Sequence, residues 1–377
     1  MFQQGLEHHK AGRNQQAIQA YSEAIKQDGS LVEAHLNLGA IFYEQGEYEK
    51  AEREFSWVVR KDPSRAVAHE NYAKTLEQLG KDNEALREWQ DAETREERPT
   101  YKESARKQRL RLEQKIRQQS SQPSDVDIPP SFDVPPNPND LALVIGIEKY
   151  QHVPNVPYAR ADARTVEEYL HNLGYEPRNV ESLLNEQATL ANLKIAVEST
   201  LPRRVKPDSR VFLYYAGHGS PDPLTGDTYL LPHDGRPDHL TQTGYALTDL
   251  YAQLGELEAS QVVVAIDACF SGIGDRSVSS TGRSSKITPP VLAAPRVAAI
   301  TATHGDQISF PKKDQPHGLF TYYFLKAIQD GHAHLGEIFD TLGPQVENDA
   351  RLQGHAQSPS LRSSAPNARA FSLWGGK

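Results

Sequence analysis

The first hundred residues of the 377-residue chain repeat with a period of 34, and this period constrains the fold more than any other feature. Each repeat carries a glycine, an alanine, an aromatic residue and smaller apolar residues in one register. The equivalent positions are Gly12, Gly46 and Gly80; Ala17, Ala51 and Ala85; Tyr21, Phe55 and Trp89; Ala24, Val58 and Ala92; and Gly5, Gly39 and Ala73. Such a period is typical of stacked helix-turn-helix units. The sequence therefore predicts three helix pairs over residues 1–99.

These residue types resemble the tetratricopeptide repeat. In that repeat the glycine lies in the turn, the alanine lets two helices approach closely, and the aromatic residue fills the space between them. Tetratricopeptide repeats present a concave surface to peptides or partner proteins. The resemblance therefore implies that the repeats receive a regulatory protein or deliver a protein substrate.

Two further segments follow the repeats. Residues 100–118 predict one more helix, because Tyr101, Ala105, Leu112 and Ile116 fall on one face. We interpret it as a cap on the last repeat; a basic arm for nucleic acid is the alternative, which Glu103 and Glu113 weaken. Residues 119–139 are rich in Pro, Ser and Asp, which predicts a linker or an extended strap at the domain boundary.

Charge and hydropathy exclude several classes of function. The formal net charge is −9, whereas binding to nucleic acid or to an anionic membrane needs a positive field. No apolar stretch approaches the ~18 residues of a membrane helix. The first ten residues lack the apolar core of a secretory signal. We expect a cytoplasmic protein without nucleic-acid or membrane partners.

The pattern of apolar and polar residues changes at Leu141, where short apolar runs begin to alternate with helical patterns. Residues 141–147, 210–217, 261–268 and 296–302 read as buried strands, and RNVESLL reads as a further strand. Residues 160–173, 189–200, 318–328 and 335–350 read as helices. This order predicts an α/β sandwich over residues 140–377, with a mainly parallel sheet flanked by helices.

Two of these strands end in reactive residues. One ends in Tyr-Tyr-Ala-Gly-His218-Gly219, and the other in Asp-Ala-Cys269-Phe-Ser-Gly; Cys269 is the only cysteine of the chain. Parallel neighbours bring both ends to one edge of the sheet. His218 can then take the proton of Cys269, and the N–H groups of Gly219 and Cys269 can stabilise an oxyanion. A lone cysteine is otherwise a small core residue.

Residues 140–365 resemble the caspase-like peptidase domain, in its metacaspase or bacterial orthocaspase branch. The matching segments are ALVIGIEKY, YARADAR, YYAGHGS, YLLPHD, DACFSG, ITATHGDQ, GLFTYYFLKAI and QSPSL. The resemblance implies a cysteine endopeptidase with a His–Cys dyad. Chains of this layout look like parts of bacterial stress, cell-death or defence pathways. The alternatives are a catalytically silent scaffold whose repeats bind partners, and a transpeptidase or ligase that uses the same thiol.

Two aspartates bear on the pocket for P1, the residue before the scissile bond. Asp267 points to the same side of its strand as Cys269 by alternation, and a carboxylate there suits Arg, then Lys. The resemblance implies a second aspartate at Asp162. Asp267 binding a loop, or Asp162 capping the helix from 163 onward, is the structural alternative. Arg160 and Arg164 beside Asp162 leave open an Asp-directed protease.

Self-processing is a further implication of the resemblance. Residues 272–296 are rich in Ser and Gly, which predicts a mobile loop. Caspase-like enzymes often cut the loop at this place. Arg276, Arg283 and Lys286 are the candidate sites, with Arg283 first; a solvated basic loop is the alternative.

The chain offers little sign of a metal site. Many metacaspases need calcium, and the resemblance places weak candidates at Asp234 and Asp249, beside Thr248. An acidic ligand expected after the cysteine is Arg276 here, and calcium favours six or more oxygen ligands. We expect no required cofactor. His233, His304, His317 and His355 lack metal-ligand spacing and read as structural or surface residues.

Overall fold

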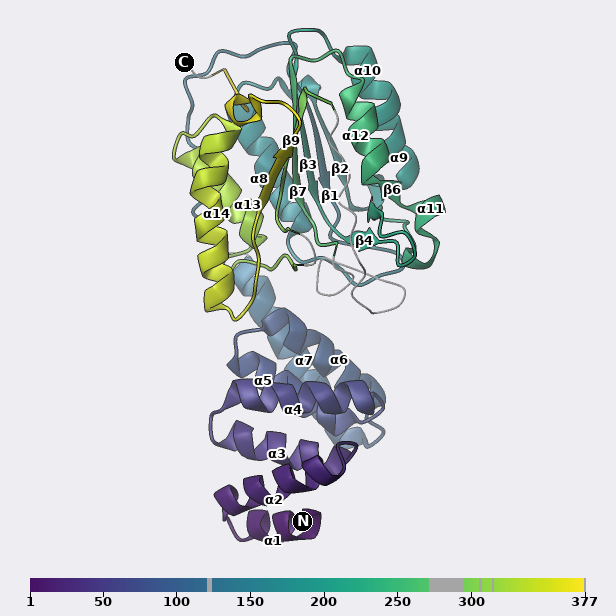
Figure 1. Cartoon of the computed structure of the whole chain (residues 1–377), viewed down its shortest axis with the longest axis vertical. Helices are drawn as coiled ribbons and strands as arrows, with labels where there is room; N and C mark the ends of the chain where they lie inside the picture. Colours follow the sequence, from purple (N-terminus) through teal and green to yellow (C-terminus); the bar gives the residue numbers. More distant parts are fainter. Residues whose placement is uncertain (121–123, 271–293, 305–306, 314, 376–377) are drawn as a thin grey trace. The chain divides into compact units, whose positions relative to one another are not determined.

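The computed structural model describes residues 1–120, 124–270, 294–304, 307–313 and 315–375. The chain divides into two compact units, Met1–Ser121 and Gln122–Lys377. The first unit consists of the helices α1 to α7, and the second has a sheet between helices (Figure 1). None of the helices within the described residues has the length and apolar character needed to cross a membrane.

The first unit is a stack of helix pairs, as predicted. The pairs are α1 (Phe2–Lys10) with α2 (Asn14–Gln27), α3 (Val32–Glu44) with α4 (Tyr48–Lys61), and α5 (Ala66–Gln78) with α6 (Asp82–Arg95). The turn glycines Gly12, Gly46 and Gly80 have φ of 69°, 76° and 73°, a conformation that other residues rarely adopt.

Close helix approach explains a second set of glycines. A Cβ on Gly5 would lie 2.6 Å from the Tyr21 ring, and one on Gly39 would lie 2.8 Å from the Phe55 ring. Both rings are buried, as is Trp89 at the equivalent place in the third pair. Each aromatic side chain therefore fills the space left by a small residue on the partner helix.

The long helix α7 (Pro99–Ser120) covers the last pair. On α7, Ala105 and Leu112 are buried against the last helix pair. Tyr101 is 51% exposed and lies under the Arg98 guanidinium, so the buried face of this helix does not include Tyr101, which the sequence pattern had placed on it. The basic residues of α7 form ion pairs with the preceding helices: Arg109 with Glu93, Arg111 with Glu77, and Lys115 with Asp82. These pairs favour the cap over the arm for nucleic acid.

The second unit has a six-stranded sheet in the order β2-β1-β3-β7-β8-β9. Its strands are β1 (Leu141–Gly146), β2 (Val180–Leu184), β3 (Arg210–Ala216), β7 (Gln261–Asp267), β8 (Val297–Thr301) and β9 (Ser360–Ser363). All pairings are parallel except that of β9 with β8. This confirms the predicted fold class. Because β2 and β3 lie on opposite sides of β1, the strand order reverses between β1 and β3, which is where ligands bind in such sheets.

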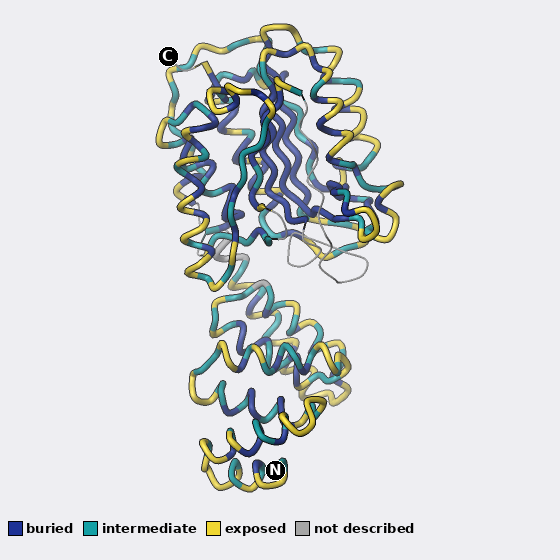
Figure 2. Tube along the Cα trace, in the orientation of Figure 1, coloured by how far each residue is buried: buried dark blue, intermediate teal, exposed yellow. Residues whose placement is uncertain are grey.

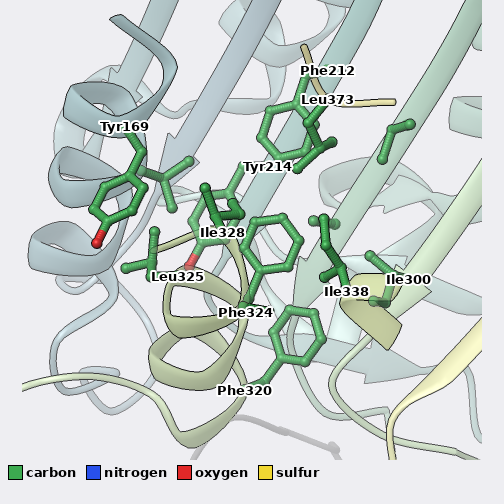
Figure 3. Close-up of a cluster of buried hydrophobic side chains, with 14 of the residues drawn as sticks. Tyr169, Phe212, Tyr214, Ile300, Phe320, Phe324, Leu325, Ile328, Ile338 and Leu373 are labelled. Carbon is green, nitrogen blue, oxygen red and sulfur yellow. The ribbon is translucent and has the colours of Figure 1, made fainter. Parts of the chain in front are cut away.

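Helices cover both faces of this sheet (Figure 1). One face packs against α8 (Ala159–Asn172), α13 (Leu319–Gln329) and α14 (Leu335–Leu352). The other packs against α9 (Leu190–Ile195), α10 (Leu201–Arg204) and α12 (Leu247–Gly255). Figure 2 shows the strands buried between these layers, and Figure 3 shows aromatic residues such as Phe212 and Phe324 meeting in the first core.

Smaller elements complete the unit. A second, three-stranded antiparallel sheet consists of β4 (Gly219–Pro221), β5 (Thr228–Leu230) and β6 (Tyr245–Ala246). The short helix α11 (Leu240–Thr243) precedes β6. The sequence pattern did not predict this sheet or β9, because two to four residues are too few to establish an alternation.

Residues 124–139 form an extended strap on the second unit, which decides between the two predictions for this segment. Val126 is fully buried in the core that contains α8 and α13. Phe132 packs on Trp374 with 5.5 Å between ring centres. Near the end of the strap, the Pro138 carbonyl accepts a hydrogen bond from Asn179.

Candidate active site

The two reactive residues stand at the same level of neighbouring strands. In the parallel pairing of β3 with β7, Ala216 lies opposite Asp267. His218 and Cys269 each follow two residues later, and the backbone N–H of Gly217 donates to the Asp267 carbonyl, 3.3 Å away. The structure thus brings the predicted pair together at the carboxyl end of the sheet, next to the place where the strand order reverses.

The imidazole of His218 is held in one tautomer. Its Nε2 lies 2.7 Å from the Pro154 carbonyl oxygen, in the loop after β1. A carbonyl oxygen only accepts, so Nε2 carries the proton and the neutral ring has its lone pair on Nδ1. The Tyr150 ring packs 4.7 Å from the imidazole, and its hydroxyl accepts from the His218 backbone N–H at 2.7 Å. In the neutral ring, Nδ1 is therefore the nitrogen that can accept a proton.

The glycines around His218 allow close approach of the backbone. A Cβ on Gly219 would clash with the carbonyl oxygen of Cys269 and lie 2.6 Å from the Phe270 ring. A Cβ on Gly217 would lie 2.5 Å from the Tyr150 hydroxyl. Side chains at either position would separate the histidine strand from the cysteine strand or displace Tyr150. The histidine and cysteine segments are thus in direct contact.

Cys269 is fully buried in this structure. Its Sγ accepts a hydrogen bond from the backbone N–H of Ser309 and lies 3.7 Å from the Ser309 carbonyl oxygen. Ser309 belongs to the segment between β8 and α13. This segment therefore contacts the sulfur directly.

Asp267 is the last residue of β7, two residues before Cys269, and is also fully buried. Its two carboxylate oxygens accept hydrogen bonds from the hydroxyls of Ser309 and Thr321, each at 2.7 Å. Asp267 therefore does bind a loop residue, which was the structural alternative for this position. Both of these donors are neutral hydroxyl groups.

Asp162 is buried in the first turn of α8 and does not cap that helix, because the N-cap residue is Tyr158. Its Oδ2 accepts from the Gly318 backbone N–H at 3.0 Å, and its Oδ1 lies 2.8 Å from His317 Nδ1. Arg160 and Arg164 are exposed, since two residues along a helix turn a side chain by about 200°. Asp162 pairs with His317, a residue interpreted from sequence as structural or surface.

The remaining sequence candidates lie elsewhere. Arg276, Arg283 and Lys286 fall outside the described residues. Asp234 accepts from the Leu190 backbone N–H at 3.0 Å at the start of α9, and Asp249 is exposed on α12. The other histidines have separate surroundings: His233 is buried against the Lys149 carbonyl, His355 stacks on Phe310, and His304 is exposed.

One group of metal-ligand type occurs among the described residues, in the first unit. It consists of His69, Glu88 and Asp91. His69 Nδ1 lies 2.7 Å from Glu88, and Nε2 lies 3.0 Å from the Pro63 carbonyl oxygen. Burial opposes protonation of His69, but these hydrogen bonds outweigh it and raise its pKa. Both nitrogens are engaged as donors, so the imidazole is a poor metal ligand.

Several functional neighbours escaped the sequence interpretation. The Pro154 carbonyl orients His218, and backbone acceptors give no side-chain signal. Ser309 contacts both Cys269 and Asp267, and Gln357 donates to the Ala302 carbonyl at 3.2 Å beside it. The segments ITATHGDQ and QSPSL pointed to this region, but not to these contacts.

Comparisons with known proteins agree with this architecture. The caspase-domain family model matches residues 139–371, and two tetratricopeptide-repeat models match residues 5–46 and 41–101. No curated protein matches the chain. Among solved structures, protein GSU0716 from Geobacter sulfurreducens is 20% identical, with a TM-score of 0.49, over 62% of this chain and 98% of that one.

Two repeat proteins are similar to the first unit. The first tetratricopeptide domain of Spaghetti (RPAP3), solved with an HSP90 peptide, is 17% identical over 31% of this chain and 90% of its own, with a TM-score of 0.29. The Arabidopsis OM64 repeat domain is 24% identical over 30% of this chain and 92% of its own, with a TM-score of 0.28. The family model over most of the second unit is decisive: the chain belongs to the caspase family and carries tetratricopeptide repeats in front of its caspase domain.

Proposed function

We propose that the second unit is a cysteine endopeptidase that uses His218 and Cys269. The observation that carries this proposal is the register: both residues follow paired positions of β3 and β7, and His218 Nε2–H is fixed on Pro154. His218 Nδ1 takes the thiol proton, and the thiolate of Cys269 attacks the substrate carbonyl. The N–H groups of Gly219 and Cys269 stabilise the resulting oxyanion.

The same groups complete the cycle. His218 returns its proton to the leaving amine, which departs and leaves an acyl group on Cys269. Water then attacks the thioester, with His218 Nδ1 as the base, and releases the carboxylic acid. The thiol and the neutral imidazole are restored, so the reaction consumes only water.

The pocket favours a basic P1 side chain, with Arg ahead of Lys. Asp267 lies two residues before the nucleophile, and its carboxylate accepts hydrogen bonds from the hydroxyls of Ser309 and Thr321. The Ser309 hydroxyl rotates about a single bond, so a guanidinium can replace it on the Asp267 carboxylate with bidentate geometry. Asp162 adds a second carboxylate from α8. An acidic P1 side chain would meet repulsion from both.

Substrate panels test this proposal. Fluorogenic peptides ending in Arg, Lys, Gln or Asp are compared for wild type, Cys269→Ala and Asp267→Asn. We expect cleavage after Arg, then Lys, no turnover by Cys269→Ala, and a loss of roughly a hundredfold in kcat/KM for Arg in Asp267→Asn. Asp340→Asn is the matched control, because that carboxylate is 65% exposed and pairs with Arg369. Faster cleavage after Asp than after Arg would make the P1 assignment wrong.

The repeats and the loop extend this proposal. The first unit recruits a protein substrate or a regulatory protein, in keeping with the family of its repeats.

The enzyme cuts its own loop at Arg276, Arg283 or Lys286, within a cytoplasmic stress or defence pathway. We leave calcium out of this proposal, because Asp234 and Asp249 are only two of the six or more oxygen ligands that calcium favours. Two fragments from wild type, and none from Cys269→Ala, would support self-cleavage.

A second candidate is a scaffold whose repeats do the work. The full burial of Cys269 under Ser309 favours it, since a silent site needs no access for a substrate. The two candidates differ in the reactivity of the thiol in the folded chain.

A further inference from the structure

His317 lies in the segment before α13 and is almost completely buried, with 1% of its surface exposed. Both of its ring nitrogens face carboxylates: Nδ1 lies 2.8 Å from Asp162 Oδ1, and Nε2 lies 3.0 Å from Asp127 Oδ1. A carboxylate accepts hydrogen bonds, so both nitrogens donate and the ring is an imidazolium. The geometry therefore places one positive charge between two negative ones.

Asp127 comes from the strap, and the strap holds it firmly. Its Oδ2 accepts from the Ser124 backbone N–H at 2.6 Å, and Thr165 of α8 donates to its Oδ1 at 3.4 Å. The preceding residue, Val126, is fully buried in the core beside α8. The strap carboxylate is thus a fixed part of the unit, 190 residues away from His317 in the sequence.

The three charged groups have a net charge of one negative unit. Asp162 and Asp127 contribute two negative charges and His317 one positive charge. Without Asp127, the imidazolium would cancel Asp162 completely. Asp162 and His317 are buried and Asp127 is partly exposed, so this difference of one charge is screened less than it would be in water.

We propose that His317 is a positioning residue for Asp162, and that Asp127 of the strap preserves the negative charge that a basic P1 side chain meets. This inference rests on the proposed function, because it takes Asp162 as part of the P1 pocket. It adds that the segment joining the repeats to the caspase domain also sets the selectivity of that domain.

The charge state of His317 agrees with this arrangement. Burial opposes protonation, but the hydrogen bonds and charges of Asp127 and Asp162 outweigh it and raise its pKa to about 9. The other charged or titratable groups on the elements packed here are Asp125 of the strap, Tyr169 of α8, Tyr322 and Lys326 of α13, and Glu148, Arg160 and Lys312. His317 is therefore charged at neutral pH.

Asp127→Asn tests the inference, and Asp125→Asn is its matched control. Asp125 belongs to the same strap and pairs with Lys326 at 2.9 Å, so both variants lose one carboxylate there. The measured quantity is the ratio of kcat/KM for Arg to that for Gln at P1, from pH 6 to pH 8. The His317 pKa is followed by NMR on ¹³C-labelled histidine, with the resonance identified by its loss in His317→Gln.

We expect the ratio to fall roughly tenfold at pH 6 in Asp127→Asn, because His317 is then fully charged and cancels Asp162. The ratio should recover toward the wild-type value as pH passes the lowered His317 pKa of this variant. Wild type and Asp125→Asn should show a constant ratio over the same range. A new titration in selectivity that coincides with the NMR pKa is an effect that mere loosening of the strap would not produce.

The outcomes separate the two proposals. A wild type that does not favour Arg overturns the proposed function and this inference with it. A wild type that favours Arg, together with an Asp127→Asn variant whose ratio is unchanged, overturns the inference alone. A wild-type His317 pKa near its ordinary value of about 6.5 also overturns the inference, whatever the substrate preference.

Discussion

The two units each bury a protonated histidine, and they do so in different ways. In the repeat unit, His69 binds Glu88 and the Pro63 carbonyl, which are 19 and 6 residues away in the sequence. In the caspase domain, His317 binds Asp162 and Asp127, which are 155 and 190 residues away. The first histidine is held by the turn before its own helix and by the next helix, whereas the second joins a helix start, a strap and a loop.

This difference follows from how the units are built. His35 binds Glu54 at the same separation of 19 residues, so the His–Glu pair of the third repeat also occurs in the second. Each repeat contacts only its neighbours, so the same local contacts recur from one repeat to the next. The caspase domain gathers its site from distant segments, and two carboxylates rather than one form hydrogen bonds with the buried imidazolium. Local changes should therefore remain local in the repeats, whereas changes at His317 should reach the active site.

The largest expected effect tests the local character of the repeats. Trp89 is 1% exposed, and its indole N–H donates to Glu77 at 2.7 Å. Trp89→Ala should lower the free energy of unfolding of the repeat unit by about 3–5 kcal/mol, because it leaves a large cavity and removes the indole donor of Glu77. Hydrogen exchange measured by mass spectrometry should show lost protection in α5, α6 and α7, with β3 and β7 unchanged.

Trp57→Ala provides the matched control. Trp57 is only partly buried and stacks on His35 at 3.8 Å, so the same substitution should cost roughly 1–2 kcal/mol. If Trp89→Ala also removed protection from β7, the separation between local and distant contacts would be broken.

A smaller effect should appear in the pH dependence of the free energy of unfolding. Folding raises the pKa of His317 from 6.5 to about 9, so the folded caspase domain binds this proton more tightly than the unfolded chain. The resulting stability is fully present below pH 6.5 and is lost as pH rises to about 9; it amounts to about 3 kcal/mol. The pKa of His69 is also raised, which gives the repeat unit a loss of the same sign above pH 6.5.

Urea unfolding at pH 6.5 and pH 9 checks this prediction. Trp374 lies in the caspase domain and is buried, so its fluorescence reports that unit in a chain with Trp57→Phe and Trp89→Phe. Asp127→Asn should reduce the difference in stability between the two pH values, because one of the two carboxylates is gone. A caspase domain equally stable at both pH values in the wild type would contradict the assigned imidazolium.

The sequence predicted which strand ends carry the site but not the hydrogen bonds around its residues. The runs that end in His218 and Cys269 are apolar enough to read as buried strands, and parallel strands align their carboxyl ends, so the placement of this pair could be predicted. The pairing of Asp127 with His317 could not, because 190 residues separate them and no periodicity links a strap to a loop. The Pro154 carbonyl that orients His218 is a backbone atom, which any residue supplies.

The repeats were the easier part for the same physical reason. Gly46 and Phe55 recur at a fixed step, so each local constraint is stated three times in the sequence. Residues 124–139 read equally well as a linker or a strap, since proline-rich composition excludes helix without showing what the segment packs against. Burial of Val126 decides that question, and only the folded chain reveals it.

The central claim is that Cys269 is a nucleophile activated by His218 and directed to basic residues. A peptidyl-arginyl chloromethylketone tests it directly, because the chain has one cysteine and the adduct can be located by mass spectrometry. We predict a single adduct on Cys269 in the folded protein, formed faster than with the aspartyl analogue and slowed about a hundredfold or more in His218→Ala. A folded chain that stays unmodified, while the unfolded chain reacts, would contradict the account and favour the scaffold.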